Sequence, residues 1–375
     1  MTVQDAGRLL SPERKLARYR ASSKAAGLGV VGLAGLLALM SFATRDLNSR
    51  IARPGVTGHP RAVTPFLGID SWPYIFEIEA LIGFAVVGGI LVMRSCEQRR
   101  ATPALLFFLA ANALAWLDPL GNWGPYATYD PRLLHWPDSW PWASLAPNIE
   151  PCFAFIGYFS FYMGTPVLAV FLLRRLILPR LRQSAFPSRH PLFALTVLTF
   201  VVGFVTDTIV ELSMLKIGVF TYTQVPSFGS VNKGHLDQFP LLIQATGTTI
   251  PFIVGALLWW RNDTGLTGAE RLAQRWRILR KAGSAGVFAV FLALLSLGYL
   301  AYETPYIVVR ATNSATVVAR PWPWCETKVY DPNGRYKAAG ESGPFYTGVW
   351  ALSGDNGGRS AVRNPGQPLP GACKA

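Results

Sequence analysis

The chain of 375 residues is too apolar for a soluble domain of its length, since 51% of its residues are hydrophobic, 15% are charged and its mean hydropathy is +0.28. This composition indicates a polytopic membrane protein. The net charge of +14 does not indicate a nucleic-acid partner, because the basic residues gather in alternate loops, as membrane topology requires.

Seven apolar runs approach or reach the roughly 20 residues that a helix needs to cross a bilayer. They lie near residues 25–44, 74–93, 102–117, 152–173, 192–215, 239–260 and 284–302. Arginine and lysine cluster before the first run and after every second run, so the positive-inside rule places the N-terminus in the cytoplasm and the C-terminus outside. The loop 45–73, with four arginines, fits this rule less well. We expect an all-α, multi-pass bundle in the plasma membrane, surrounded by lipid, whose oligomeric state the sequence does not indicate.

The membrane domain, residues 25–303, is flanked by two different segments. Residues 1–24 are basic and are predicted to lie on the cytoplasmic surface. Residues 304–375 are predicted to lie outside, where the runs YIVV and ATVV favour short strands. Cys325 and Cys373 both fall in this outer tail, where disulfides can form, so we expect a bridge between them.

The second apolar run carries Glu77 and Glu79 within its first turns. Residues two apart point to nearly opposite sides of a helix, so one glutamate is expected to face the bundle and the other the head groups. A carboxylate within a span is costly and often functional. Both glutamates are therefore candidates for substrate binding, with a structural role at the interface as the alternative.

The segment from Trp116 to Pro151 holds five of the twelve tryptophans and seven prolines. Proline predicts a rigid, non-helical path, and tryptophan favours the membrane interface. Asp118 precedes Pro119 and is predicted to cap a short helix, with Asn122 one turn on. An interfacial cap and a lid over a site both fit this pattern. The candidate residues here are Asp118 and Glu150 for catalysis, and Asn122, Trp123, Tyr126, His135 and Trp136 for substrate contact.

Asp207 and Glu211 stand four residues apart in the outer half of the fifth run and share one helix face. Charged side chains in lipid face the protein interior or water, so this face should look into the bundle. Two close carboxyl groups in such a site suit proton transfer. An ion pair is the alternative, although Lys216 lies towards the membrane edge. In the sixth run, Pro251 predicts a kink.

The predicted topology places these carboxylates, with Glu303 at the end of the seventh run, in the outer half of the membrane. We therefore expect one polar site beneath the segment 118–151. The sequence holds no phosphate-binding, dinucleotide-binding, zinc-protease or serine-hydrolase motif, and its four histidines are scattered, so we expect neither a cofactor nor a metal. The chemistry that remains possible is acid–base catalysis by carboxyl groups on a lipophilic substrate, in a cavity with aromatic walls.

Four blocks carry a family resemblance: DPLGNWGPY from Asp118, HWPDSWP from His135, NIEP from Asn148, and the Asp207/Glu211 pair. Together they resemble the spirocyclase AveC family of actinobacterial membrane proteins, over about residues 70–303. The resemblance implies a spiroketal-forming enzyme of polyketide secondary metabolism that closes a dihydroxy-ketone, with dehydration of the product in some members. It assigns no catalytic residue.

On this reading, Asp207 and Glu211 are expected to supply acid and base, while Asp118 or Glu150 orients hydroxyls or stabilises a cation. Trp123, Tyr126 and Trp136 are expected to form the wall of the site. Two other functions stay open: a transporter or binding protein for a hydrophobic metabolite, with carboxylates that couple protons to movement, and a non-catalytic membrane scaffold.

Overall fold

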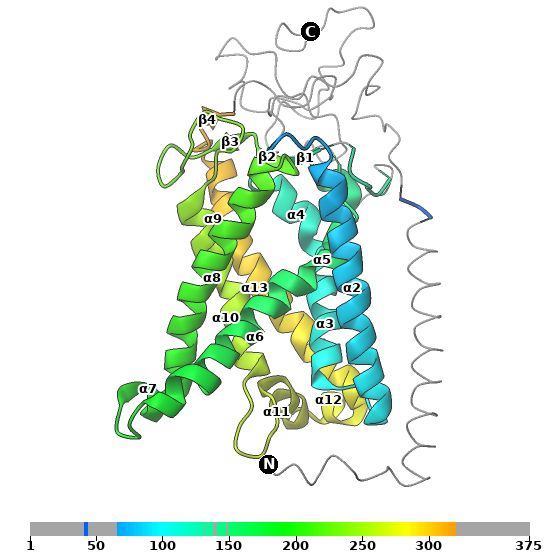
Figure 1. The fold of residues 1–375 in the computed structure, drawn as a ribbon, viewed down its shortest axis with the longest axis vertical. Coiled ribbons are helices and arrows are strands. Elements are labelled where there is room, and N and C mark those ends of the chain that lie inside the picture. Colours follow the sequence, from blue (N-terminus) through cyan, green and yellow to red (C-terminus); the bar gives the residue numbers. More distant parts are fainter. Residues whose placement is uncertain are drawn as a thin grey trace, which may run out of the picture.

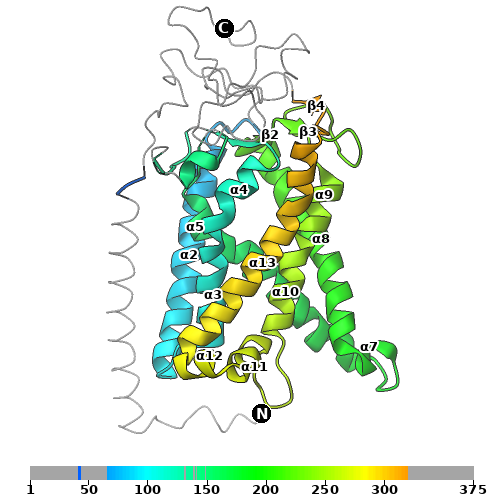
Figure 2. The same ribbon diagram turned by 180° about the vertical axis from the view of Figure 1, so that it is seen from behind.

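The computed structural model describes residues 41–43, 66–130, 132–137, 140, 142–147 and 149–319. The expected segment 1–24, most of the first span and the Cys325–Cys373 bridge lie outside these residues. Within them the protein is mostly helical, and six helices are long and apolar enough to cross a membrane, which confirms the predicted bundle (Figures 1 and 2).

The six candidate spans alternate in direction through the bundle (Figure 1). They consist of α2 (Trp72–Glu97); α3 (Pro103–Ala113), η2 (Leu114–Leu117) and α4 (Asp118–Trp123); α5 (Phe153–Tyr158), η4 (Phe159–Met163), α6 (Gly164–Phe171), η5 (Leu172–Ile177) and η6 (Leu178–Arg180); α8 (Pro191–Lys216); α9 (Leu241–Gly247) and α10 (Thr249–Trp259); and α13 (Ser284–Ala311). Short helices join them, namely η3 (Ala143–Leu145), α7 (Phe186–Arg189), α11 (Gly268–Arg275) and α12 (Arg277–Ala282).

The second of these spans is longer than predicted, because the helix continues through Pro119 to Trp123. Pro119 cannot donate a hydrogen bond to the carbonyl of Ala115. The backbone N–H of Asp118 bonds that carbonyl instead, which tightens residues Leu114–Leu117 into a 3₁₀ turn. The predicted helix cap at Asp118 is therefore wrong: Leu117 occupies the cap position, and the carboxyl of Asp118 is directed to other partners.

A second proline, Pro251, breaks the next-to-last span as predicted. Proline at this position leaves the carbonyl of Gly247 without its helical donor, and the chain divides at Thr248 into α9 and α10. The hydroxyl of Thr248 turns back to the carbonyl of Gln244, at 2.9 Å. The break gives the residues of α9 a direction different from that of α10.

Two small sheets join loops at the outer end of the bundle. β1 (Ala127–Tyr129) pairs antiparallel with β2 (Phe220–Tyr222), with Ala127 opposite Tyr222, and β3 (Gln224–Val225) pairs antiparallel with β4 (Val317–Val318). The expected strand in ATVV is confirmed. The expected strand in YIVV is wrong, because these residues continue α13, where Tyr306 packs into the buried core.

The distribution of basic residues distinguishes the two ends of the bundle. Arg99, Arg182 and Arg261 in loops and Arg280 in α12 lie with many others at the end that holds α7, α11 and α12, whereas the β-sheets and their loops mark the opposite end (Figure 1). By the positive-inside rule we expect the arginine-rich end to be cytoplasmic, and we call the opposite end the outer end.

This orientation predicts the labelling of two equally exposed positions, Phe228 in an outer loop (78% exposed) and Ile278 in α12 (82% exposed). A membrane-impermeant thiol reagent should label Phe228→Cys in intact cells, whereas Ile278→Cys should react only after permeabilisation. Labelling of the unsubstituted chain measures the background from its native cysteines. Labelling of Ile278→Cys but not of Phe228→Cys in intact cells would show that the orientation is the reverse of the predicted one.

Candidate functional site

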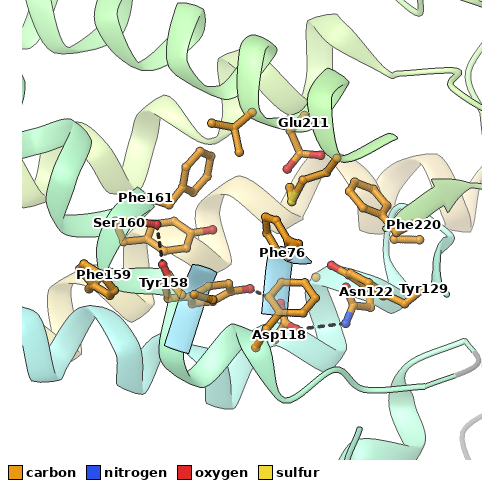
Figure 3. A pocket seen from close by; sticks show the side chains of 18 of the residues that line it. Phe76, Asp118, Asn122, Tyr129, Tyr158, Phe159, Ser160, Phe161, Glu211 and Phe220 are labelled. Atoms are coloured by element: carbon orange, nitrogen blue, oxygen red, sulfur yellow. Dashed lines mark hydrogen bonds between the residues drawn. The ribbon is translucent and has the colours of Figure 1, made fainter. Parts of the chain in front are cut away.

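A cavity of about 380 Å³ lies within the outer half of the bundle (Figure 3). Its walls come from α2, α4, α5, η4, α8, α9 and α13, and from the sheet of β1 and β2. Aromatic side chains dominate this lining, among them Phe76, Phe153, Phe161, Tyr162 and Phe220. The polar groups of the lining fall into two clusters, each built around a buried carboxyl group.

The first cluster is built on α4, where Asp118 and Asn122 stand one turn apart. The Asn122 Nδ2 atom donates to Asp118 Oδ2 at 3.2 Å and to Glu150 Oε2 at 2.9 Å, so one amide bridges two carboxyl groups. The shared amide places the carboxyl groups of Asp118 and Glu150 close to each other. On its other side, Asp118 Oδ1 accepts a hydrogen bond from the hydroxyl of Tyr158. All three bridged residues are buried.

The Trp/Pro-rich segment returns Glu150 to this cluster. The backbone N–H of Trp136 donates to the carbonyl of Glu150 at 3.0 Å, and the N–H of Cys152 donates to the carbonyl of Leu134 at 2.8 Å. Glu77 of α2 also holds this part of the segment, because its Oε1 accepts a hydrogen bond from the N–H of Leu134 at 2.5 Å. These backbone contacts hold Glu150 beside α4.

The second cluster is centred on Glu211 of α8. Its Oε2 accepts from the hydroxyl of Tyr222 at 2.8 Å, and its Oε1 accepts from Gln244 Nε2 at 3.4 Å. Gln244 in turn accepts at Oε1 from the hydroxyls of Tyr302 and Tyr306, both at 2.7 Å. Two donors on its oxygen leave the amide nitrogen of Gln244 for Glu211, so the glutamine is fixed in one orientation.

Two tyrosines that lie outside the spans help to define the electrostatics of the cavity. Burial raises the pKa of Tyr222 well above the ordinary tyrosine value, and the charge of Glu211 raises it further. Burial likewise raises the pKa of Tyr129, with a second contribution from Asp118. Both phenols therefore keep their protons at neutral pH, and the hydroxyl of Tyr222 donates to Glu211.

The carboxyl groups of Asp118 and Glu211 lie on opposite sides of the cavity, with aromatic rings between them (Figure 3). A family model described as spirocyclase AveC-like matches residues 98–330, which contain both clusters. The chain belongs to the AveC-like spirocyclase family. Membership suggests a cyclase role in polyketide biosynthesis. No curated protein and no solved structure matches the chain.

In this AveC-like protein the predicted pair on α8 is divided. Asp207 and Glu211 share a buried face, but only Glu211 lines the cavity. Within the described part of the chain neither carboxyl oxygen of Asp207 has a hydrogen-bond partner, although Gln244 and Thr248 are polar neighbours. Asp207 is therefore buried beside Glu211 on the same helix face, but outside the lining of the cavity.

Several other predicted residues lie away from the cavity. Trp123 and Tyr126 pack under the guanidinium of Arg310, at 4.4 and 4.0 Å from the ring centroids. His135 is buried with its Nδ1 atom 2.8 Å from the carbonyl of Leu133, and the ring of Trp136 stacks on Trp140. None of these four lines the cavity. Of the two glutamates on α2, Glu79 lines it and Glu77 holds Leu134.

Sequence reasoning did not select the residues of α13 and α5 that complete the site. The sequence analysis does not single out Tyr158, yet its hydroxyl donates a hydrogen bond to Asp118. Tyr299 and Tyr302 line the cavity, and Glu303 is fully buried, with neither carboxyl oxygen hydrogen-bonded within the described part of the chain. The signal was present, since Tyr299, Tyr302, Glu303 and Tyr306 recur at helical spacing on one face.

Gly121 of α4 explains how α13 approaches the first cluster. A β-carbon at Gly121 would collide with the hydroxyl of Tyr299 and lie 3.3 Å from Glu303 Oε1, whereas a β-carbon at Gly89 in α2 would meet nothing within 4 Å. Glycine at position 121 therefore sets the distance between α4 and α13.

We predict that Gly121→Ala lowers the free energy of unfolding by about 1–3 kcal/mol, the usual cost of overpacking, and displaces Tyr299. Gly89→Ala is the matched control and should be neutral or stabilising by up to about 1 kcal/mol, because alanine favours the helix. Thermal unfolding of both variants in detergent measures the difference. Equal effects of the two substitutions would contradict the close approach of α4 and α13.

Proposed function

We propose that the protein is a cyclase of the plasma membrane that closes a lipophilic dihydroxy-ketone to a spiroketal, with loss of one water, by acid–base catalysis without a cofactor. The observation that carries this proposal is the pair of buried carboxyl clusters that face each other across one aromatic-lined cavity. Family membership supports the reaction class.

The proposed acid is the Asp118–Glu150 pair. The two buried carboxyl groups share the single amide donor of Asn122, and two close carboxyl groups in a buried site do not both ionise easily, so this pair is arranged to hold a proton for donation. Addition of one substrate hydroxyl to the ketone first gives a hemiketal, with the hydroxyl proton ending on the former carbonyl oxygen. The acid then protonates the hemiketal hydroxyl, the C–O bond breaks, and water leaves.

The oxocarbenium ion that remains is a cation in an enclosed apolar site. The carboxylate left by the acid and the faces of Phe76, Tyr158 and Tyr162 stabilise such a charge. The second hydroxyl then attacks the cation and gives its proton to Glu211, which Tyr222 and Gln244 hold in place. One proton has been delivered and one taken up, so the site retains its total number of protons.

Walls on both sides of the cation also account for stereocontrol. Spiroketals form without enzymes in acid, so the protein's contribution is to determine the face of the cation that the second hydroxyl attacks.

Asp207 does not line the cavity, and it acts as a positioning group for Glu211 that does not touch the substrate. A further loss of water, to an alkene, requires an acid and a base across the same cavity, so the same residues support dehydration of the product.

Removal of the acid and of the base tests this mechanism. Asp118→Asn and Glu211→Gln should each lower the conversion of a dihydroxy-ketone precursor by roughly 10²–10⁴-fold, the usual contribution of general acid–base catalysis. The control is Asp263→Asn, which changes an exposed carboxylate in a cytoplasmic loop and should leave conversion unchanged. Membranes with equal amounts of each protein are compared by the mass and spiro epimer of the product. Wild-type conversion and epimer ratio in both site variants would refute the proposal.

A transporter for a hydrophobic metabolite is the second candidate, because of one specific observation. The buried carboxyl group of Asp207 lies near Thr248, where the span of α9 and α10 is broken. Carboxylates beside broken helices are typical of ion-coupled transporters. Proton-dependent flux of a chemically unchanged metabolite into vesicles, abolished by Asp207→Asn, would favour this function over the cyclase.

A further inference from the structure

The cavity is closed towards the outer surface and open to one side. The residues that close it at the outer end, Ala127, Tyr129, Phe220 and Tyr222, are at most 9% exposed. The lining residues that are exposed or half-buried come instead from α2, α5, η4 and α8, apart from Gly121 of α4. They are Phe76, Glu79, Ala80, Gly83, Gly121, Gly157, Tyr158, Phe159, Ser160, Phe161, Thr206, Val210 and Met214. The accessible side of the cavity therefore faces outwards from the bundle between α2 and α8.

The two rims of this opening lie at the same depth in the membrane. Phe76 and Gly83 follow the outer end of α2 at Trp72 by four and eleven residues, which is about 6 and 17 Å of helix. Met214 and Thr206 precede the outer end of α8 at Lys216 by two and ten residues, about 3 and 15 Å. Half of the hydrocarbon core is about 15 Å thick, so the opening faces the outer leaflet.

α2 and α8 flank the opening and do not form a packed helix pair in the described part of the chain. α2 packs against α3 and α5, whereas α8 packs against α6, α9 and α10, and the two helices stand on either side of the bundle in both views (Figures 1 and 2). The span of α5, η4 and α6 crosses between them (Figure 1), and Ser160 and Phe161 of η4 contribute to the accessible part of the lining. We call this opening, with its rims at Phe76, Gly83, Val210 and Met214, the lateral portal.

The chemistry changes from the portal to the interior of the cavity. At the portal the lining is apolar apart from Glu79, Ser160 and Thr206, whereas the interior carries Asp118, Glu211 and the hydroxyl of Tyr299. A volume of about 380 Å³ is near the lower limit for a ligand pocket, which is about 300–1,000 Å³. The cavity therefore suits the hydroxyl-bearing end of a substrate better than the whole of a large lipophilic molecule.

We propose that the substrate enters from the outer leaflet through the lateral portal, with its hydroxyl-bearing end first. This inference rests on the proposed function and specifies its substrate class: an amphiphile longer than the cavity, whose apolar remainder stays between α2 and α8 in contact with lipid. The reacting hydroxyls reach the two carboxyl clusters without passing through the outer loops. The product leaves by the same route.

A bulky side chain on the portal rim tests this route. Val210→Trp should lower kcat/KM for a long dihydroxy-ketone much more than for a short one that carries the same reacting groups, so the ratio of the two values falls about tenfold. Ile209→Trp is the matched control: Ile209 is the neighbouring residue, is 61% exposed and does not line the cavity, so this ratio should stay within about twofold of wild type.

Gly83→Leu on the opposite rim provides a second variant if Val210→Trp is poorly folded. A β-carbon at Gly83 would lie at an ordinary contact distance of 3.4 Å from Phe159, so the helix tolerates a side chain there. The ratio should fall in this variant too. An unchanged ratio in both folded rim variants would overturn the portal.

A measurement without turnover separates the portal from the proposed function. A spin label at Val210→Cys, in the full-length chain with its four native cysteines replaced by alanine, should relax faster with oxygen dissolved in lipid than with a water-soluble nickel complex. A long dihydroxy-ketone should reduce the relaxation caused by oxygen for a label at Val210→Cys, and it should not do so for a label at Ile209→Cys. Preferential relaxation by the nickel complex would overturn the portal. A lipid-facing, ligand-protected position 210 without cyclisation would instead refute the cyclase and retain the portal.

Discussion

The structure depends on one constraint: carboxyl groups at membrane depth must be placed inside the protein, because lipid offers them no hydrogen-bond donors. Asp118 and Glu150 meet this constraint through Asn122, whose single amide donates to both. Glu211 meets it through Tyr222 and Gln244, and Gln244 is itself held by two tyrosine hydroxyls. These contacts join α4, α8, α9, α13 and the outer sheet around one cavity.

Two prolines make room for these contacts. Pro119 turns the chain into a 3₁₀ turn just before Asp118, and Pro251 divides α9 from α10 just after Gln244. A third irregularity, the π-helical turn η4, places Phe159, Ser160, Phe161 and Tyr162 along the cavity. Departures from regular helix geometry therefore coincide with the polar site, as is common where helices build functional sites.

The outer segment between α4 and α5 serves the site mainly through its backbone. Its tryptophans pack on one another and on Phe155, and its N–H and carbonyl groups hold Glu150 beside α4. Its strand β1 closes the outer end of the cavity together with β2, while the side between α2 and α8 stays accessible. A closed outer end and a lipid-facing side suit a substrate that partitions into the bilayer.

The sequence was sufficient for the membrane architecture, because span length, hydropathy and arginine distribution are properties of the chain read in one dimension. It also predicted the break at Pro251 and a polar site that includes Asp118, Glu150 and Glu211, and the four sequence blocks indicated the family that the family model shows. It could not separate Glu211 from Asp207, since helical spacing places both on one face and only the packing of α9 and α13 decides which one reaches the cavity.

Tertiary structure alone decided the partners. It placed Trp123, Tyr126, His135 and Trp136 outside the lining of the cavity: Trp123 and Tyr126 pack under Arg310, Trp136 stacks on Trp140, and the Nδ1 atom of His135 lies beside the carbonyl of Leu133. It brought in Tyr158, Tyr299 and Tyr302, which the sequence presents as ordinary aromatic residues of membrane helices. A hydrogen bond between helices depends on how those helices rotate and approach each other, and no pattern within a single helix specifies that rotation.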